Sequence, residues 1–152
     1  MIEYIRIAKR YKPKGVKVRF RRDEYLAPAH AIEFPDGSKE MYVPKPVNRD
    51  ALYMYLHECA HHHLGHVKPT YKEPLWKMEY EAEKWAMATM RREGHSVSRA
   101  MIMLAKRYVE ECAIVDKKKG RPGPNSRIIR WMKSRTRTKR IPNYRKPKRK
   151  AA

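Results

Sequence analysis

The sequence predicts a small α+β domain followed by a strongly basic tail. In the first third, short apolar segments flank a turn, which is typical of an antiparallel sheet or hairpin. The middle of the chain contains longer segments with apolar residues at helical spacing. The 152 residues carry a net charge of +21, and residues 117–152 contribute 16 Lys and Arg and no acid. We therefore divide the chain into a domain over 1–116 and a tail over 117–152.

The N-terminal elements follow from local patterns. Residues 2–12 place Ile and Ala at helical spacing, which predicts a short helix, with a strand as the alternative. Residues 16–20, VKVRF, alternate between apolar and basic side chains and predict a half-buried strand. Two apolar runs then flank Pro-Asp-Gly at 35–37, which predicts a hairpin with its turn there.

Three helices are expected next. Asn48 or Asp50 can cap a helix that ends near Gly65, a residue suited to a left-handed C-terminal position. A second helix is predicted over 75–93 and a third over 98–118. The third has an apolar face of Met101, Leu104, Ala105, Tyr108, Cys112 and Ala113.

The basic tail contains one further expected element. A Gly- and Pro-rich linker leads to SRIIRWMKS, residues 126–134, which fits a short amphipathic helix. The segment after it is so rich in Lys and Arg that we expect it to be disordered when it is free or to become ordered on a partner.

The segment HECAHHHLGH, residues 57–66, carries the chemistry. His57 and His61 are four positions apart, so both rings project from one face of the helix and can reach one metal ion. Glu58 is suited to act as general base on the attacking water. This HExxH arrangement predicts a catalytic zinc site in a zincin-like domain. A solvated, histidine-rich helix face is the alternative.

A third metal ligand is expected from a later helix. The pattern HExxHxxGxxH, in which a third histidine binds, is absent because Leu64 and Val67 occupy the required positions. Glu79 lies on the apolar stripe of the second helix, where an acid needs a compensating charge. We predict Glu79 as the ligand, with Glu81 as the alternative and His66 beside the site rather than bound.

The segments HECAHHHLGH and EYEAEKWA together resemble the ImmA/IrrE type of zinc metallopeptidase. That family has an HExxH helix, often ending in Gly-His, and then a helix with the pattern ExxA(N/D)xFA. The resemblance covers about 1–115 and implies Zn²⁺ bound by the first glutamate of the second motif, which is Glu79 here. Ala82 and Ala86 match the pattern, Trp85 replaces its Phe, and Glu83 replaces its Asn or Asp. It also implies a protein substrate, often a transcriptional repressor, and an origin on a phage or mobile element.

The charge of the tail predicts a nucleic-acid partner. Lys and Arg neutralise phosphates and release counterions, and aromatic rings can stack on bases. An acidic protein is the alternative partner, and Trp131 could instead pack the short helix onto the domain. The candidate contact residues are Lys117, Lys118, Lys119, Arg121, Arg127, Arg130, Trp131, Lys133, Arg135, Arg137, Lys139 and Arg140.

The sequence thus predicts a zinc-dependent metallopeptidase that cleaves a specific protein and is recruited to nucleic acid by its tail. The alternatives are a non-enzymatic zinc-bearing scaffold and a nucleic-acid-binding component of a phage or nucleoprotein assembly. A SprT-type protease is disfavoured because it needs a third histidine, and His66 is too close to His61. The two cysteines do not form a CxxC pair, and no apolar run is long enough for a signal peptide or a membrane span. These features indicate a cytosolic protein with free thiols.

Overall fold

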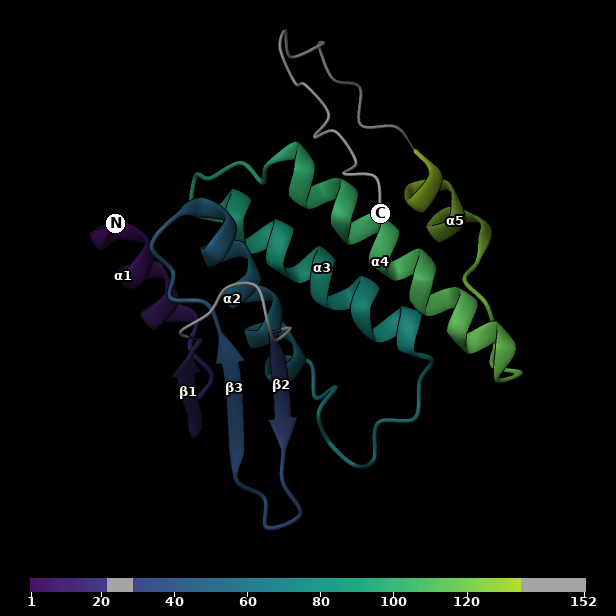
Figure 1. The fold of residues 1–152 in the computed structure, drawn as a ribbon, viewed down its shortest axis with the longest axis horizontal. Coiled ribbons are helices and arrows are strands. Elements are labelled where there is room, and N and C mark those ends of the chain that lie inside the picture. The colour runs from purple at the N-terminus through teal and green to yellow at the C-terminus, as the bar shows by residue number, and fades with distance from the viewer. Residues whose placement is uncertain (22–28, 135–152) are drawn as a thin grey trace, which may run out of the picture.

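A computed structural model describes residues 1–21 and 29–134. The sheet packs against α2, and α3, α4 and α5 follow one another away from it (Figure 1). The elements are α1 (Ile2–Tyr11), β1 (Val16–Phe20), β2 (His30–Glu33), β3 (Lys39–Val43), α2 (Arg49–His63), α3 (Leu75–Arg92), α4 (Arg99–Lys118) and α5 (Ser126–Lys133). The α+β class is therefore confirmed, as is a helix rather than a strand over residues 2–11.

The sheet is mixed rather than wholly antiparallel. Its strand order is β1-β3-β2, with β2 antiparallel and β1 parallel to the central strand. The predicted hairpin is confirmed, and its turn uses Gly37 at φ 82°, a conformation that favours glycine. The expectation of an antiparallel sheet was wrong for β1. The chain between β1 and β3 includes β2, and this longer connection lets β1 join the free side of β3 in parallel.

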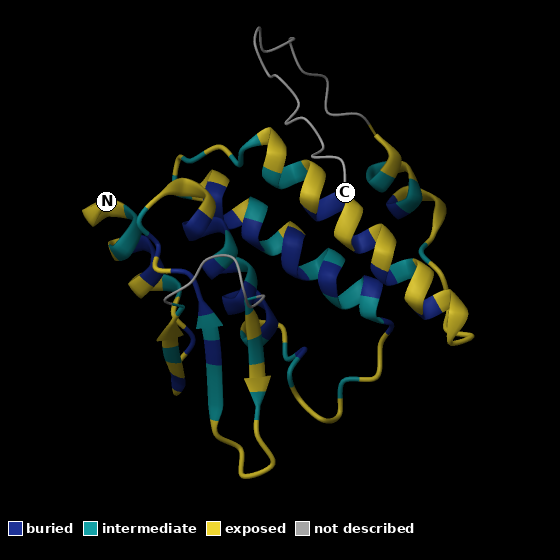
Figure 2. Ribbon diagram, in the orientation of Figure 1, coloured by how far each residue is buried: buried dark blue, intermediate teal, exposed yellow. Residues whose placement is uncertain are grey.

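The larger core lies between the sheet, α1, α2 and α3. Met41 and Val43 of the central strand are fully buried, as are Leu52 and Leu56 on the α2 face beneath it. Buried positions follow α2 and α3 along most of their length, whereas α4 exposes one side (Figure 2). This core fixes α2, the helix that carries the HExxH motif, between the sheet and α3.

The second core joins α3, α4 and α5. Val109 and Cys112 pack with Ile128 of α5, and Trp131 lies against this cluster. Residues 117–134 are consequently part of the folded structure, because the apolar side of α5 is covered by α3 and α4. The short amphipathic helix expected over 126–134 is present as α5.

Asp116 ties the second core to α3. Its side chain is fully buried and accepts a hydrogen bond from the backbone N–H of Trp76 at 2.9 Å and from Arg121 at 3.2 Å. Pro74 precedes α3 and provides no side-chain cap. Asp116 therefore satisfies one of the N–H groups at the start of the helix that carries Glu79.

The predicted helix caps are largely as expected. Asn48, not Asp50, caps α2 by accepting from the backbone N–H of Ala51.

Both cysteines are free and buried. Among the described residues, no helix combines the length and apolar character that crossing a membrane requires.

Candidate metal centre

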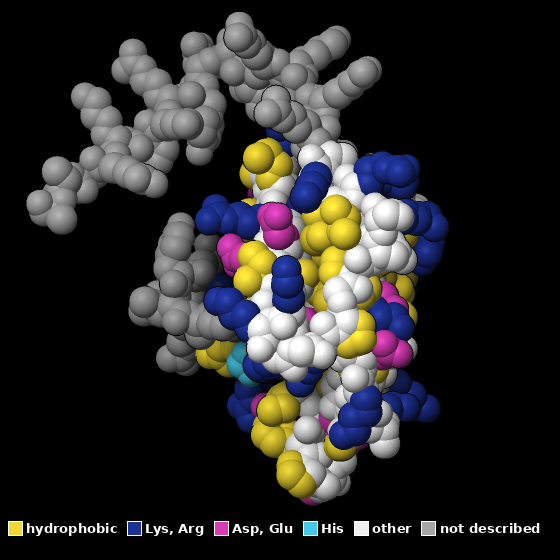
Figure 3. Space-filling view, turned by 90° about the vertical axis from the view of Figure 1, so that its right-hand side faces the viewer, with side chains coloured by type: hydrophobic (Ala, Val, Ile, Leu, Met, Phe, Trp, Pro, Cys, Tyr) yellow, Lys and Arg dark blue, Asp and Glu magenta, His cyan; other side chains and the backbone are white. Residues whose placement is uncertain are grey.

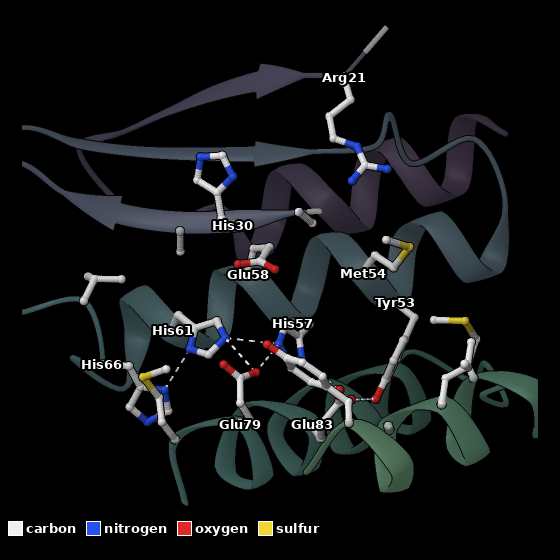
Figure 4. A pocket seen from close by; sticks show the side chains of 18 residues that line it. Arg21, His30, Tyr53, Met54, His57, Glu58, His61, His66, Glu79 and Glu83 are labelled. Carbon is white, nitrogen blue, oxygen red and sulfur yellow. Dashed lines mark hydrogen bonds and ion pairs between the residues drawn. The ribbon is translucent and has the colours of Figure 1, made fainter. Parts of the chain in front are cut away.

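Three ligand atoms converge between α2 and α3. The Nε2 atoms of His57 and His61 are 3.1 Å apart, and Oε2 of Glu79 lies 3.1 Å from the first and 3.5 Å from the second. All three side chains are largely buried. The predicted ligands are thus brought together, and this group could hold a metal ion. Figure 4 shows them facing one another across the gap between the two helices.

The triangle has the dimensions of a metal site. At bond lengths of about 2.0–2.1 Å, two ligands of a tetrahedral zinc ion are about 3.3–3.4 Å apart. The three observed separations, 3.1, 3.1 and 3.5 Å, fall around that value. The donor set is two imidazoles and one carboxylate, and within residues 1–21 and 29–134 no fourth side chain joins it.

Local sequence explains why the triangle forms. The histidines are one helical turn apart on α2, so their positions follow from the helix itself. Glu79 is brought to them by the close approach of α3, where Ala82 and Ala86 are both fully buried. Small side chains at these positions allow the two helices to pack near enough for a glutamate to span the gap.

His57 is held from its other side by Glu83. Its Nδ1 atom is 3.3 Å from Oε1 of Glu83, close but outside hydrogen-bond alignment. Glu83 in turn accepts a hydrogen bond from the hydroxyl of Tyr53. Glu83 thus reaches the His57 ring, although the ImmA/IrrE family pattern has Asn or Asp at this position.

His61 is held by a different set. Its Nδ1 atom lies 3.0 Å from Nδ1 of His66, whose Nε2 atom lies 3.0 Å from Oε2 of Glu81. The expectation that His66 stands beside the site is met by this geometry. Glu81, the alternative ligand, contacts His66 and is not part of the triangle.

The acids of the cluster favour a positive charge at its centre. Burial raises the pKa of Glu79, but hydrogen bonds from His57 and His61 outweigh it and lower this pKa to about 2. Burial lowers the pKa of His57, yet its contacts with Glu79 and Glu83 hold that pKa well above the usual range. A cation bound between these side chains would take the place of a proton on His57.

Glu58 lies on the sheet side of the histidine pair. Its side chain is buried, and Figure 4 places its carboxylate between His30 of β2 and the two histidines of α2. Burial raises the pKa of Glu58, while the positive charge of neighbouring histidines lowers it to a smaller extent. The carboxyl group therefore holds a proton more readily than an exposed glutamate does.

The triangle opens into a cleft of about 700 Å³. Its walls come from β2 and from α2, α3 and α4, and they include residues that sequence reasoning missed: Arg21, His30, Met54, Met78, Leu104 and Tyr108. Leu104 and Tyr108 were expected in the core, but they are 58% and 46% exposed and line the cleft. Helical spacing groups Leu104 and Tyr108 with Cys112 on one apolar face of α4, but it does not say which part of that face meets the core.

The remaining histidines of the motif point away from the triangle. The His62 ring contacts the backbone carbonyl of Glu40 at 3.0 Å, and the His63 ring contacts that of Tyr11 at 2.9 Å. These two side chains tie α2 to β3 and to the end of α1.

The candidate nucleic-acid residues fall into four groups. Most of those within the described residues are exposed cations on the end of α4 or on α5, namely Lys117, Lys118, Lys119, Arg127, Arg130 and Lys133. Arg121 is paired with Asp116 at 3.2 Å. Trp131 is half-buried and packs edge-on against Tyr80 with ring centroids 5.1 Å apart. Arg135, Arg137, Lys139 and Arg140 lie outside the described residues.

No protein-family model, curated protein or solved structure matches this chain. The resemblance to the ImmA/IrrE family therefore depends on residues 57–66 and 79–86 alone.

Proposed function

We propose that this chain is a zinc-dependent metallopeptidase whose centre is His57, His61 and Glu79. The observation that carries the proposal is the triangle of three ligand atoms with Glu58 in the same cleft. Two histidines and one glutamate form a ligand set of catalytic zinc sites, in which the fourth position is left to water or substrate. A zinc ion held by these three residues would supply Lewis-acid chemistry, lowering the pKa of a bound water and polarising a peptide carbonyl.

Glu58 is the general base in this proposal. It accepts the proton of the attacking water and passes it to the departing amine. A carboxyl group whose pKa is raised by burial is better matched to both steps near neutral pH than an exposed one. A site that only stabilises the fold needs no such base, which favours an enzyme over the zinc-bearing scaffold.

The cleft favours a peptide with an apolar side chain beside the scissile bond. Met54, Met78 and Leu104 line it next to the ligands, so most of its wall is apolar. Methionine side chains adapt their shape to what they contact. An apolar side chain placed there would exclude water from the reacting groups.

The exposed cations of α4 and α5 support recruitment to nucleic acid. Lys and Arg side chains are spread over the face on which these helices lie (Figure 3). They continue in sequence into the basic segment 135–152. Such a surface binds phosphates without reading base sequence, and it would bring the peptidase to proteins bound on DNA or RNA.

The test compares wild type with Glu58→Gln, which keeps every metal ligand. Both proteins are loaded with Zn²⁺ and incubated with a host-cell lysate, and new protein N-termini are identified by mass spectrometry. We expect cleavage products with wild type only, because Glu58→Gln removes the proton acceptor and leaves metal and fold intact. Identical N-termini with the two proteins would reject the peptidase and favour a scaffold.

A further inference from the structure

We propose that His66 and Glu81 form a positioning relay that presents the unprotonated Nε2 atom of His61 to the metal. This inference rests on the proposed metal centre and concerns residues outside its ligand set. The relay runs from Oε2 of Glu81 to Nε2 of His66, and from Nδ1 of His66 to Nδ1 of His61, with 3.0 Å at each step.

Hydrogen-bond directions follow from the order of the groups. A carboxylate only accepts, so the ring of His66 donates from Nε2 to Glu81. A neutral imidazole has one N–H, so Nδ1 of His66 is then the acceptor. It takes the N–H on Nδ1 of His61, which leaves the lone pair of His61 Nε2 facing the triangle.

The end of α2 holds the two rings in register. Gly65 adopts φ 73°, a left-handed conformation that reverses the chain just after the helix. The backbone N–H of His66 then donates to the carbonyl of His61 at 2.9 Å, while Gly65 donates to His62 at 3.3 Å. This helix stop therefore returns His66 to the level of His61, where its side chain is 1% exposed.

The relay also joins α2 to α3 beside the metal ligands. Glu81 lies two residues after Glu79, and its side chain is 38% exposed. One helix thus provides both a ligand and the terminal acceptor of the chain that orients another ligand. Glu81 supports His61 through His66, and Glu83, which accepts from Tyr53, lies beside His57. Each histidine ligand therefore has an acid behind it.

The experiment measures metal affinity in the full chain by chelator competition, without any activity assay. His66→Leu removes the acceptor but keeps an apolar side chain of similar reach, and we expect a 10–100-fold loss of Zn²⁺ affinity. His66→Asn places a side-chain oxygen near the position of Nδ1 and should recover most of that loss. His63→Ala, on the same turn but outside the relay, is the matched control and should bind Zn²⁺ as wild type does.

A spectroscopic measurement tests the relay without a variant. In ¹⁵N-labelled, zinc-loaded wild type, two-bond ¹H–¹⁵N spectra should show His61 protonated at Nδ1 and His66 protonated at Nε2. The opposite tautomer of either ring would overturn the proposal, as would equal affinities of His66→Leu and His66→Asn. Absence of metal binding by wild type would overturn both proposals, whereas binding that His66→Leu leaves unchanged would overturn the relay alone.

Discussion

Replacing Glu79 by Gln tests the ligand assignment most directly. The change preserves shape but removes the negative charge from the one carboxylate oxygen that lies 3.1 and 3.5 Å from the histidine nitrogens. Zinc sites that fold small peptides bind with about 10–16 kcal/mol. Such sites have four protein ligands, so each ligand contributes roughly 2.5–4 kcal/mol, and we expect a loss of about 10²–10³-fold in affinity if one ligand fails.

Elemental analysis and chelator competition provide the readout. We expect wild type to contain about one Zn²⁺ per chain and Glu79→Gln to lose it at low free metal. Glu81→Gln should keep its metal with at most a modest decrease in affinity, because the amide oxygen still accepts from His66. Full retention of zinc by Glu79→Gln together with its loss in Glu81→Gln would refute the assignment.

Three further outcomes are expected. Removal of residues 135–152 should weaken nucleic-acid binding and flatten its salt dependence in anisotropy titrations. A protein that makes six to ten phosphate contacts loses roughly 10³–10⁵-fold in affinity between 50 and 200 mM salt. Unchanged affinity after the truncation would indicate another partner for this segment. Trp131→Ala should lower the free energy of unfolding in urea by about 2 kcal/mol, about half the value for a fully buried Trp, and leave the nucleic-acid affinity unchanged. Unchanged stability with weaker nucleic-acid binding would instead favour stacking of this ring on a base. Glu93 accepts a hydrogen bond from the hydroxyl of Tyr11 at 2.7 Å, and this contact lowers the pKa of Glu93. The ionised carboxylate therefore stabilises the fold above the unfolded-state pKa of about 4.3. This contribution is lost as the pH falls through the lower pKa of the folded state. Glu93→Gln should therefore flatten the acid side of the stability profile, and an unchanged profile would contradict this assignment.

The sequence could predict most of the elements and the histidine pair because both depend on near neighbours in the chain. Asn48 and Gly65 delimit α2 through hydrogen bonds and backbone conformation within a few residues. His57 and His61 share a face because a helix repeats every 3.6 residues. Glu79 was identified because an acid on an apolar stripe needs a compensating charge, and this reasoning holds whatever the packing angle.

The tertiary structure decided which faces of those elements meet. The parallel pairing of β1, the contact of Glu81 with His66 and the packing of Trp131 on Tyr80 each join segments whose orientations local sequence does not specify. Helical spacing places Leu104 and Cys112 on one apolar face of α4, and only the packing against α3 assigns Cys112 to the core and Leu104 to the cleft. Local hydrogen bonding and helical periodicity determine the elements and the candidate ligands, whereas the supporting acids and the cleft walls arise only where several elements pack together.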